Sequence, residues 1–233
     1  MDSAVIIAGG EGSRLYPLTV DRPKAMVEVG GKPLIYWVIN WLKGNGIKHI
    51  VIGVAYKKEN LYKYLEENSN FGLDVDFSEH TIQGGTAEAF RLAISRYIED
   101  RTFIAMNSDE LTNMELSDMI DTHMKFNPIA TISTAPFHCR FSVVESNAGK
   151  IIDFKYGKKL MNIQVSNGIY IFDKKILEHM PTAGSIEDDV FKVLSKEGKI
   201  ASYKMPEDKE WISVNSIKDI KDAEQKLREW NFI

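Results

Sequence analysis

The sequence contains a single cysteine, no long apolar run and no excess of positive charge. One cysteine, Cys139, cannot form a disulfide within the chain, which favours a reducing cytoplasm over secretion. No apolar run approaches the length of a membrane-spanning helix, and the N-terminus shows no charged and apolar leader. With 29 basic and 33 acidic side chains the net charge is -4, so nucleic acid is not expected as the main partner. We therefore expect an unprocessed cytoplasmic protein that does not act on membranes.

The stretch from Ala4 to Glu28 carries the strongest signal in the sequence. A short apolar run is followed by Gly9, Gly10 and Gly12, and then by two cations, which are Arg14 and Lys24. Glycines let a backbone bend sharply and approach a ligand closely. A glycine loop after a strand, with cations behind it, predicts a site for an anion such as a polyphosphate. On the glycines alone, a structural turn is an equal alternative.

Two common phosphate-binding motifs are excluded at this loop. No Gly-Lys-Ser/Thr follows the last glycine, as the phosphate loop of ATPases requires. The spacing also differs from the G-x-G-x-x-G of dinucleotide-binding proteins, which disfavours a nicotinamide-dependent dehydrogenase.

The chain of 233 residues is 44% hydrophobic, which suits one large α/β domain or two small lobes that share a core. In residues 1–112, strands and helices alternate, which predicts a mostly parallel sheet wound on both faces. The expected strands are 4–8, 49–54, 73–77 and 102–106, and the expected helices are 34–42, 58–68 and 86–97.

Residues 113–233 show a different pattern, with one helix followed by closely spaced strands. We expect helices at 115–126, 185–196 and 217–230, and strands at 130–135, 141–145, 150–154, 165–172 and 211–214. Asn147-Ala148-Gly149 predicts a hairpin turn. This half is expected to form a mixed sheet that adds a wall over the nucleotide site and continues the first sheet.

Three segments together resemble the signature of the sugar-1-phosphate nucleotidyltransferases, also called NDP-sugar pyrophosphorylases. Residues 9–19 match GG-x-G-x-R-L-x-P-L-T, residues 22–26 match the following P-K-A segment, and residues 31–35 match G-x-K/R-P-L/M. The resemblance implies a Rossmann-like, doubly wound, mostly parallel mixed sheet of the nucleotide-diphospho-sugar transferase type. It also implies a short single-domain form, 1–233, with a nucleotide-binding half at 1–112 and a sugar-phosphate-binding half at 113–233.

The resemblance implies Mg²⁺ as cofactor, and NTP and a sugar 1-phosphate as substrates. Arg14 would contact the β- and γ-phosphates, and Lys24 would neutralise phosphate during the transfer. Asp109, in Asn107-Ser108-Asp109, matches the family's metal-binding aspartate, with a turn or helix-capping role as its alternative. The nucleotide would also contact a wider set of residues: Ala8, Gly9, Gly10, Gly12, Ser13, His80, Gly85 and Thr86.

Two residues of that set have structural alternatives. His80 stands where many relatives place a base-reading glutamine, but a lone histidine is more often structural. Thr86 lies in a segment that resembles the L-G-T-A loop against the nucleobase, and it could equally cap the helix that follows.

The sugar phosphate would be held by the second half. Asn167 and Gly168 fall in a segment that resembles the N-A-G-I-Y-x-F strand, and Lys158 or Lys159 could be the lysine of the usual F-x-E-K-P segment. Residues 185–189 resemble the S-L/I-E-x-D helix start, and Ser185 with acids behind it is also simply a good helix cap.

The sequence departs from the family pattern at three places. Ser142 stands where a glycine usually approaches the sugar, and the glutamate of F-x-E-K-P is missing. Ser213 occupies the position at which the family has its second metal-binding aspartate. Asn215 instead matches the asparagine that N-acetylglucosamine-1-phosphate uridylyltransferases use. We therefore expect Asn215, with Ser213 as the alternative, to be the second and weaker metal ligand.

The motifs are most similar to the mannose-1-phosphate guanylyltransferases. Glucose-1-phosphate thymidylyl- or uridylyltransferase is the alternative activity, and a non-catalytic nucleotide-sugar-binding relative is the alternative class. The aromatics Trp37, Trp41 and Trp230 are expected to be exposed and would suit a subunit contact in a homo-oligomer.

Overall fold

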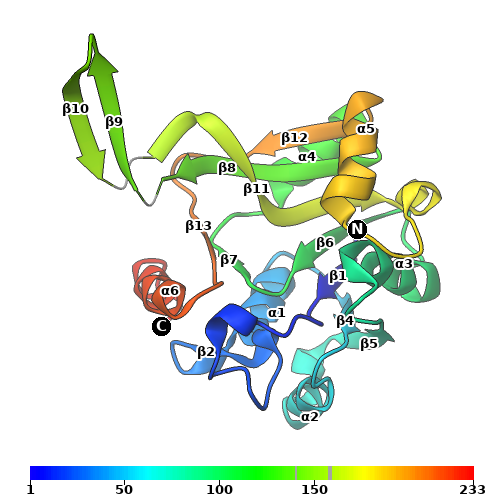
Figure 1. Cartoon of the computed structure of the whole chain (residues 1–233). Helices are drawn as coiled ribbons and strands as arrows, with labels where there is room; N and C mark the ends of the chain where they lie inside the picture. Colours follow the sequence, from blue (N-terminus) through cyan, green and yellow to red (C-terminus); the bar gives the residue numbers. More distant parts are fainter. Residues whose placement is uncertain (140, 157–158) are drawn as a thin grey trace.

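The computed structural model describes residues 1–139, 141–156 and 159–233. Its centre is a seven-stranded sheet with the strand order β12-β8-β11-β6-β1-β4-β5 (Figure 1). The bounds of these strands, in chain order, are β1 Ser3–Ile7, β4 His49–Val54, β5 Asp74–Glu79, β6 Thr102–Asn107, β8 Ala130–His138, β11 Lys159–Asp173 and β12 Ile200–Lys204.

Four strands of the first half form a parallel core. β1 pairs in parallel with β4 and with β6, and β4 pairs in parallel with β5. β11 is antiparallel to both β6 and β8, whereas β12 is parallel to β8. The predicted mixed, mostly parallel sheet is therefore confirmed, and one sheet runs through both halves of the chain.

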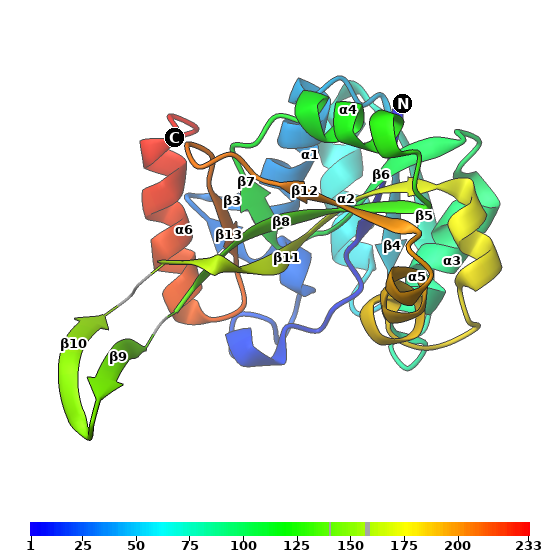
Figure 2. The same cartoon turned by 90° about the horizontal axis from the view of Figure 1, so that it is seen from above.

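Helices cover both faces of this sheet because successive residues of a buried strand point to opposite sides. Ile6 packs into a core with α1 (Leu34–Gly44), α2 (Glu59–Glu67), α4 (Ser117–Phe126) and α6 (Ile217–Glu229). Its neighbour Val5 packs into a second core with α3 (Gly85–Tyr97) and the segment η5–α5 (Ile186–Phe191 and Lys192–Lys196). Figure 2 shows α1 and α4 on one side of the sheet and α3 and α5 on the other.

Most predicted elements are present, with ends that differ by a few residues. The helix expected at 34–42 runs to Gly44, and Gly46 follows with a φ of 85°. The short edge strand β12 was not predicted. Two small ladders were also not predicted: β7 (Glu110–Thr112) with β13 (Trp211–Ser213), and β2 (Glu28–Val29) with β3 (Lys32–Pro33).

The strands β9 (Ser142–Asn147) and β10 (Lys150–Tyr156) form a separate two-stranded sheet. The predicted hairpin turn is present, with φ of 47° at Ala148 and 79° at Gly149, as a two-residue turn of this type requires. The second half was expected to continue the first sheet as a wall over the nucleotide site, but β9 and β10 form a sheet of their own, which extends the β8–β11 pair beyond His138 and Lys159. The hairpin instead projects from the body (Figure 1). We call β9, β10 and Phe141 the arm.

None of the described helices is both long and apolar enough to cross a membrane.

Candidate active site

The carboxyl ends of β1, β4, β5 and β6 lie at one edge of the sheet, where ligands of such folds bind. The glycine loop follows β1, His80 follows β5, and Asp109 follows β6. Parallel pairing alone therefore collects three of the predicted site segments at this edge.

The glycine loop is held by its own backbone. Ala8 donates its N–H to the carbonyl of Gly53 at 2.8 Å, and Gly10 accepts from the N–H of Lys24 at 3.1 Å. Gly12 has a φ of 65°, and a Cβ there would lie 3.0 Å from Lys24 Cβ, so this turn needs glycine. A Cβ on Gly10 would meet nothing within 4 Å, so the surface at Gly10 is open to a ligand.

Four predicted residues meet beside this loop. Lys24 forms an ion pair with Asp109, and its Nζ also donates to the amide oxygen Oδ1 of Asn215 at 2.8 Å. Arg14 donates from Nη2 to the same oxygen at 2.7 Å. The side chains of Lys24 and Asp109 are about 15% exposed, so the pair is shielded from most solvent but remains open on one side. We call Arg14, Lys24, Asp109 and Asn215 the charged cluster.

A second set of hydrogen bonds fixes the orientation of Asn215. Its Nδ2 donates to Ser213 Oγ at 2.6 Å, and Ser213 donates to the carboxylate of Glu110 at 3.1 Å. Trp211 Nε1 donates to the other oxygen of Glu110 at 2.6 Å. This relay leaves Oδ1 of Asn215 facing the two cations. On the other side, the N–H of Asn215 donates to Asp219 Oδ2 at 3.0 Å.

Glu110 is buried directly behind Asp109. Burial, and in second place the neighbouring carboxylate of Asp109, raises the pKa of Glu110 well above its ordinary value. Its hydrogen bonds to Trp211 and Ser213 act in the opposite direction. Glu110 therefore supports the charged cluster indirectly, because it binds Ser213, which in turn binds Asn215.

Sequence reasoning missed Glu110 and Trp211 as partners of the site, and it weighed Ser213 only as a metal ligand. Their pairing follows from the β7–β13 ladder, in which Ser213 lies opposite Glu110, and this pairing joins positions far apart in the chain. The signal for Asp219 was present in the sequence, because Ser216 with an acid three residues later is a capping pattern, and Ser216 Oγ donates to Asp219 at 2.9 Å.

His80 lies under the glycine loop. A Cβ on Gly9 would come within 2.4 Å of His80 Nε2, so the glycine makes room for the ring. His80 Nδ1 is 3.0 Å from the carbonyl of Thr81, and the buried Nε2 has no hydrogen-bond partner among the described residues. The imidazole therefore supports the loop from below.

Thr86 connects the two halves of the chain. Its hydroxyl accepts the N–H of Ile186 at 2.8 Å, and the N–H of Ala87 donates to Gly184 at 3.0 Å. No side-chain hydrogen bond caps helix α3, so Thr86 is not the cap that the sequence offered as an alternative. Gly85 has a φ of 69°, and a Cβ there would lie 2.3 Å from the carbonyl oxygen of Gly184.

Two predicted sugar-side residues lie in an irregular part of β11. The pairing of β11 with β8 shifts register between Ser166 and Tyr170. Asn167 is fully buried there and donates from Nδ2 to Ser133 Oγ at 3.0 Å, whereas its Oδ1 has no partner among the described residues. A Cβ on Gly168 would lie 2.9 Å from Asn107 Nδ2, so Gly168 allows β11 to pass close to the end of β6.

The two remaining sugar-side predictions are not brought to the cluster. Ser142 is exposed at the base of the arm, opposite Tyr156. Lys158 lies outside the described residues, and so does the side chain of Lys159.

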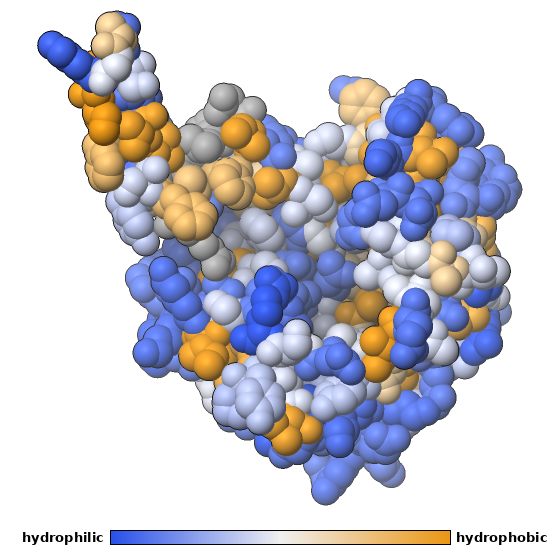
Figure 3. Space-filling model, viewed as in Figure 1, coloured by the Kyte–Doolittle hydropathy of each residue, from blue (hydrophilic) through white to orange (hydrophobic). Residues whose placement is uncertain are grey.

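A cleft of about 570 Å³ lies between the base of the arm and helix α6. Its lining includes Ser166, Trp211 and Ser213, which places it next to the hydrogen-bond relay. It also contains Lys218, Asp222 and Lys226, and Lys226 is paired with Glu210 and Glu229. In Figure 3 the surface is hollowed between the part that carries β8 and β11 and the part that carries the N-terminal loop.

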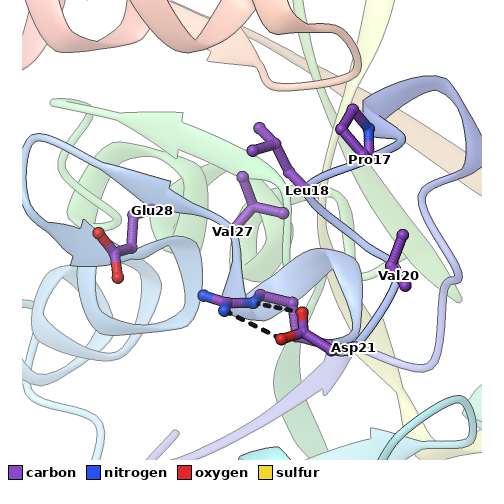
Figure 4. A pocket seen from close by; sticks show the side chains of 7 residues that line it. Pro17, Leu18, Val20, Asp21, Val27 and Glu28 are labelled. Carbon is purple, nitrogen blue, oxygen red and sulfur yellow. Dashed lines mark hydrogen bonds and ion pairs between the residues drawn. The ribbon is translucent and has the colours of Figure 1, made fainter.

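A separate hollow of about 480 Å³ lies along residues 17–28 (Figure 4). Leu18 and Val27 line it together with the ion pair between Arg22 and Asp21, whose atoms are 3.0 Å apart. This Arg22 is already neutralised by its neighbour, and the hollow has none of the four cluster residues in its lining.

The donor set of the charged cluster suits a hard cation. Asp109 supplies a carboxylate oxygen and Asn215 an amide oxygen, and both contact the single ammonium group of Lys24, so they lie close enough to share one cation. Among the described residues no group of three or more His, Cys, Asp or Glu side chains could hold a metal. A Mg²⁺ ion held here would need further oxygens from substrate phosphates or water.

Comparisons with known proteins identify relatives of the whole chain. The model of the nucleotidyl transferase family matches residues 3–229. The chain is 28% identical over 223 residues to the mannose-1-phosphate guanylyltransferase catalytic subunit beta of Dictyostelium discoideum, with 93% of this chain and 62% of the relative covered. It is 26% identical over 236 residues to a UTP–glucose-1-phosphate uridylyltransferase of Synechocystis, with 93% of this chain and 61% of the relative covered.

The chain thus spans 61–62% of the length of these two curated relatives. Among solved structures, HddC from Yersinia pseudotuberculosis complexed with GMP-PN aligns with a TM-score of 0.76 and 25% identity. That alignment covers 97% of this chain and 100% of HddC.

Proposed function

Because the chain belongs to the nucleotidyl transferase family, we propose that it transfers a nucleotidyl group from an NTP to a sugar 1-phosphate. The products are an NDP-sugar and pyrophosphate. The observation that carries this proposal is the charged cluster, in which Arg14, Lys24, Asp109 and Asn215 meet beside the glycine loop.

This reaction needs little proton chemistry. The attacking sugar phosphate is already an anion near neutral pH, so no general base is required. The protein must hold two mutually repelling anions in line and stabilise the charge that develops on the α-phosphate and on the leaving pyrophosphate. Cations, backbone N–H groups and a metal ion serve these tasks.

The described residues divide these tasks among themselves. The glycine loop offers backbone N–H groups at Gly10, where no side chain blocks the approach. Arg14 binds the β- and γ-phosphates, and Lys24 neutralises charge during the transfer. Asp109 and Asn215 would hold Mg²⁺, which when bound supplies a positive charge that neutralises the phosphates. Glu110 and Ser213 keep the oxygen of Asn215 directed at the cluster.

The sugar phosphate enters from the second half of the chain. The cleft beside Trp211 and Ser213 opens next to the relay, and Lys218 in its lining offers an ammonium group to a phosphate. This division keeps the two anions on opposite sides of the charged cluster.

Mannose 1-phosphate and GTP are the substrates that we favour. The support is the similarity to a mannose-1-phosphate guanylyltransferase and to HddC, whose structure holds GMP-PN. The similar identity to a glucose-1-phosphate uridylyltransferase makes UTP or dTTP with glucose 1-phosphate the alternative pair. Pyrophosphate release, measured with each NTP against a panel of sugar 1-phosphates, distinguishes them. Activity with only glucose 1-phosphate and dTTP would reject the mannose version.

The catalytic proposal is tested by Asp109→Asn. We expect pyrophosphate release to fall by orders of magnitude, while NTP binding measured by calorimetry survives in part, because Arg14 and the glycine loop remain. Asp21→Asn is the matched control, since Asp21 pairs with Arg22 outside the cluster, and it should keep full activity. Equal activity of Asp109→Asn and the parent protein would contradict the proposal.

A nucleotide-sugar-binding protein without turnover is the second candidate function. Its motivation is that the cluster contains one carboxylate and an amide where the family pattern has two aspartates. Absence of pyrophosphate release with every substrate pair, together with measurable binding of an NDP-sugar, would favour it.

A further inference from the structure

The arm is an amphipathic two-stranded sheet with no second layer. In the pairing of β9 with β10, Val144 lies opposite Phe154. The pairing shifts register between Ile151 and Asp153, so Ile152 has no partner, whereas Ile151 pairs with Ser146. Residues that lie opposite one another share a face, so Ile151, Phe154 and Tyr156 lie on the face that Val144 also occupies. Lys155 points to the other face, where it forms an ion pair with Asp153 at 2.8 Å. One face of the arm is therefore apolar and the other is charged.

The apolar residues of the arm are unusually exposed. Six large side chains are between 45 and 79% exposed: Phe141, Val144, Ile151, Ile152, Phe154 and Tyr156. With about 150–200 Å² for each such side chain, they expose roughly 700 Å² of apolar surface. The projection in Figure 3 shows these orange atoms clear of the body. An isolated hairpin is at best marginally stable in water, so this face needs a cover.

The charge of the arm restricts what can cover it. Between Phe141 and Tyr156 the arm has two acidic and two basic side chains, so its net charge is zero, and the whole chain carries -4. Surfaces that bind anionic membranes or nucleic acid are rich in Lys and Arg, which the arm is not. A neutral apolar surface of this size instead fits another protein.

We propose that the cover is the arm of a second copy of this chain. Two arms related by a two-fold axis would stack their apolar faces as two layers, with the Lys155–Asp153 faces in water. An identical neutral face brings no net repulsion. The four side chains on this face expose roughly 400 Å² of apolar surface, which is close to the apolar part, about 60%, of the ~800 Å² per partner of a standard interface. Tyr156 also lines the cleft given to the sugar phosphate, so the variants that test the proposal leave Tyr156 unchanged.

The tryptophans that the sequence suggested for such a contact are engaged within the chain. Trp37 is buried and donates to the carbonyl of Val29 at 3.0 Å, and Trp41 donates to the carbonyl of Met114 at 2.7 Å. Trp230 is half-buried and donates to Glu210 at 3.0 Å. The expectation that these rings are exposed is wrong, because each closes the core around α1 and α6.

The mass of the full chain in solution tests the proposal, measured by sedimentation equilibrium from 1 to 200 µM. We expect a dimer for the parent chain and for Lys155→Thr on the charged face. The double variant Ile151→Thr/Phe154→Thr keeps strand-forming residues but removes the centre of the apolar face, so it should be monomeric. Its circular dichroism and unfolding midpoint should match those of Lys155→Thr, which shows that the body is folded.

A cross-linking experiment gives a second readout that does not depend on removing the apolar face. In a Cys139→Ser background, Phe154→Cys should give a covalent dimer with a short bis-maleimide, because stacked sheets lie about 10 Å apart. Lys155→Cys, on the opposite face, should not. A monomeric parent chain at all concentrations would overturn the proposal, and so would a dimer that survives the double variant. A monomer whose double variant raises the KM for sugar phosphate would also overturn it, since the arm would then cover its own cleft.

Discussion

Asn215 donates its amide N–H to the hydroxyl oxygen of Ser213 at 2.6 Å, and this bond turns the amide oxygen of Asn215 toward Arg14 and Lys24. An amide has two ends of similar shape, and only its hydrogen-bond partners decide which end faces a cation. Ser213 is in turn held by the buried Glu110. Ser213 therefore controls the orientation of the amide oxygen of Asn215, which contacts both Arg14 and Lys24.

Ser213→Ala should lower kcat/KM for pyrophosphate release by about fivefold, because one hydrogen bond of about 1 kcal/mol no longer orients Asn215. Ser213→Thr keeps a hydroxyl and should retain most of the activity. The free energy of unfolding in urea, measured for both variants, separates a loss of orientation from a loss of fold. Full activity of Ser213→Ala would show that Asn215 is oriented by other contacts.

Gly9→Ala and Gly10→Ala should fail in different ways. A Cβ on Gly9 would overlap the ring of His80, so Gly9→Ala should lose about 1–3 kcal/mol of unfolding free energy. A Cβ on Gly10 meets nothing, so Gly10→Ala should be as stable as the parent within ~0.5 kcal/mol but should bind NTP at least tenfold more weakly. Urea unfolding and calorimetric titration with NTP measure the two effects.

The clash at Gly9 can be checked with a double variant. Gly9→Ala combined with His80→Ala should cost less than the sum of the two single changes, because the ring that the new methyl group meets is gone. Additive costs would place the clash elsewhere.

Thr86→Val should destabilise the protein by about 1–3 kcal/mol, because the N–H of Ile186 loses its acceptor at the contact between the two halves. Thr86→Ser keeps the hydroxyl and serves as the control. We expect the KM for NTP to change less than twofold in either variant. A tenfold rise in that KM with unchanged stability would instead support a direct contact of Thr86 with the nucleotide.

Stability should fall as the pH drops below the ordinary pKa of histidine. Burial lowers the pKa of His123, whose Nδ1 lies 2.8 Å from Thr131 Oγ1, with Arg101 acting in the same direction and Asp173 opposing it. The unfolded chain therefore binds a proton near pH 6.5 that the folded chain does not bind until lower pH. The free energy of unfolding should decrease between pH 6.5 and the lower folded-state pKa, by at most about 1.4 kcal/mol per pH unit for this group.

His123→Gln tests the assignment of this slope. Its absolute stability will differ from that of the parent, so the comparison is between the pH dependences of urea unfolding from pH 7.5 to 5.5. The dependence of the unfolding free energy on pH should be shallower in the variant, by an amount that corresponds to at most one bound proton. An identical slope would assign the effect to other groups.

The sequence by itself determined the features that depend on neighbouring residues. The glycine loop, the alternation of strands and helices in the first half and the turn at Ala148-Gly149 follow from local backbone preferences, and the fold class is confirmed. The family is also confirmed, because its signature is a run of nearby residues between Gly9 and Ile35. The assigned roles of Arg14, Lys24, Asp109 and the other site residues stay predictions.

Only the tertiary structure decided which distant residues support one another. Lys24 and Asn215 are 191 positions apart, and Glu110 meets Ser213 through a ladder of three residue pairs that no local pattern announces. The hairpin turn could be predicted from the sequence, but the direction of the arm could not, because β9 and β10 extend the β8–β11 pair and their direction depends on how that pair sits in the sheet. Local preferences act over a few residues, whereas these contacts depend on which edges and faces remain free after the sheet has formed.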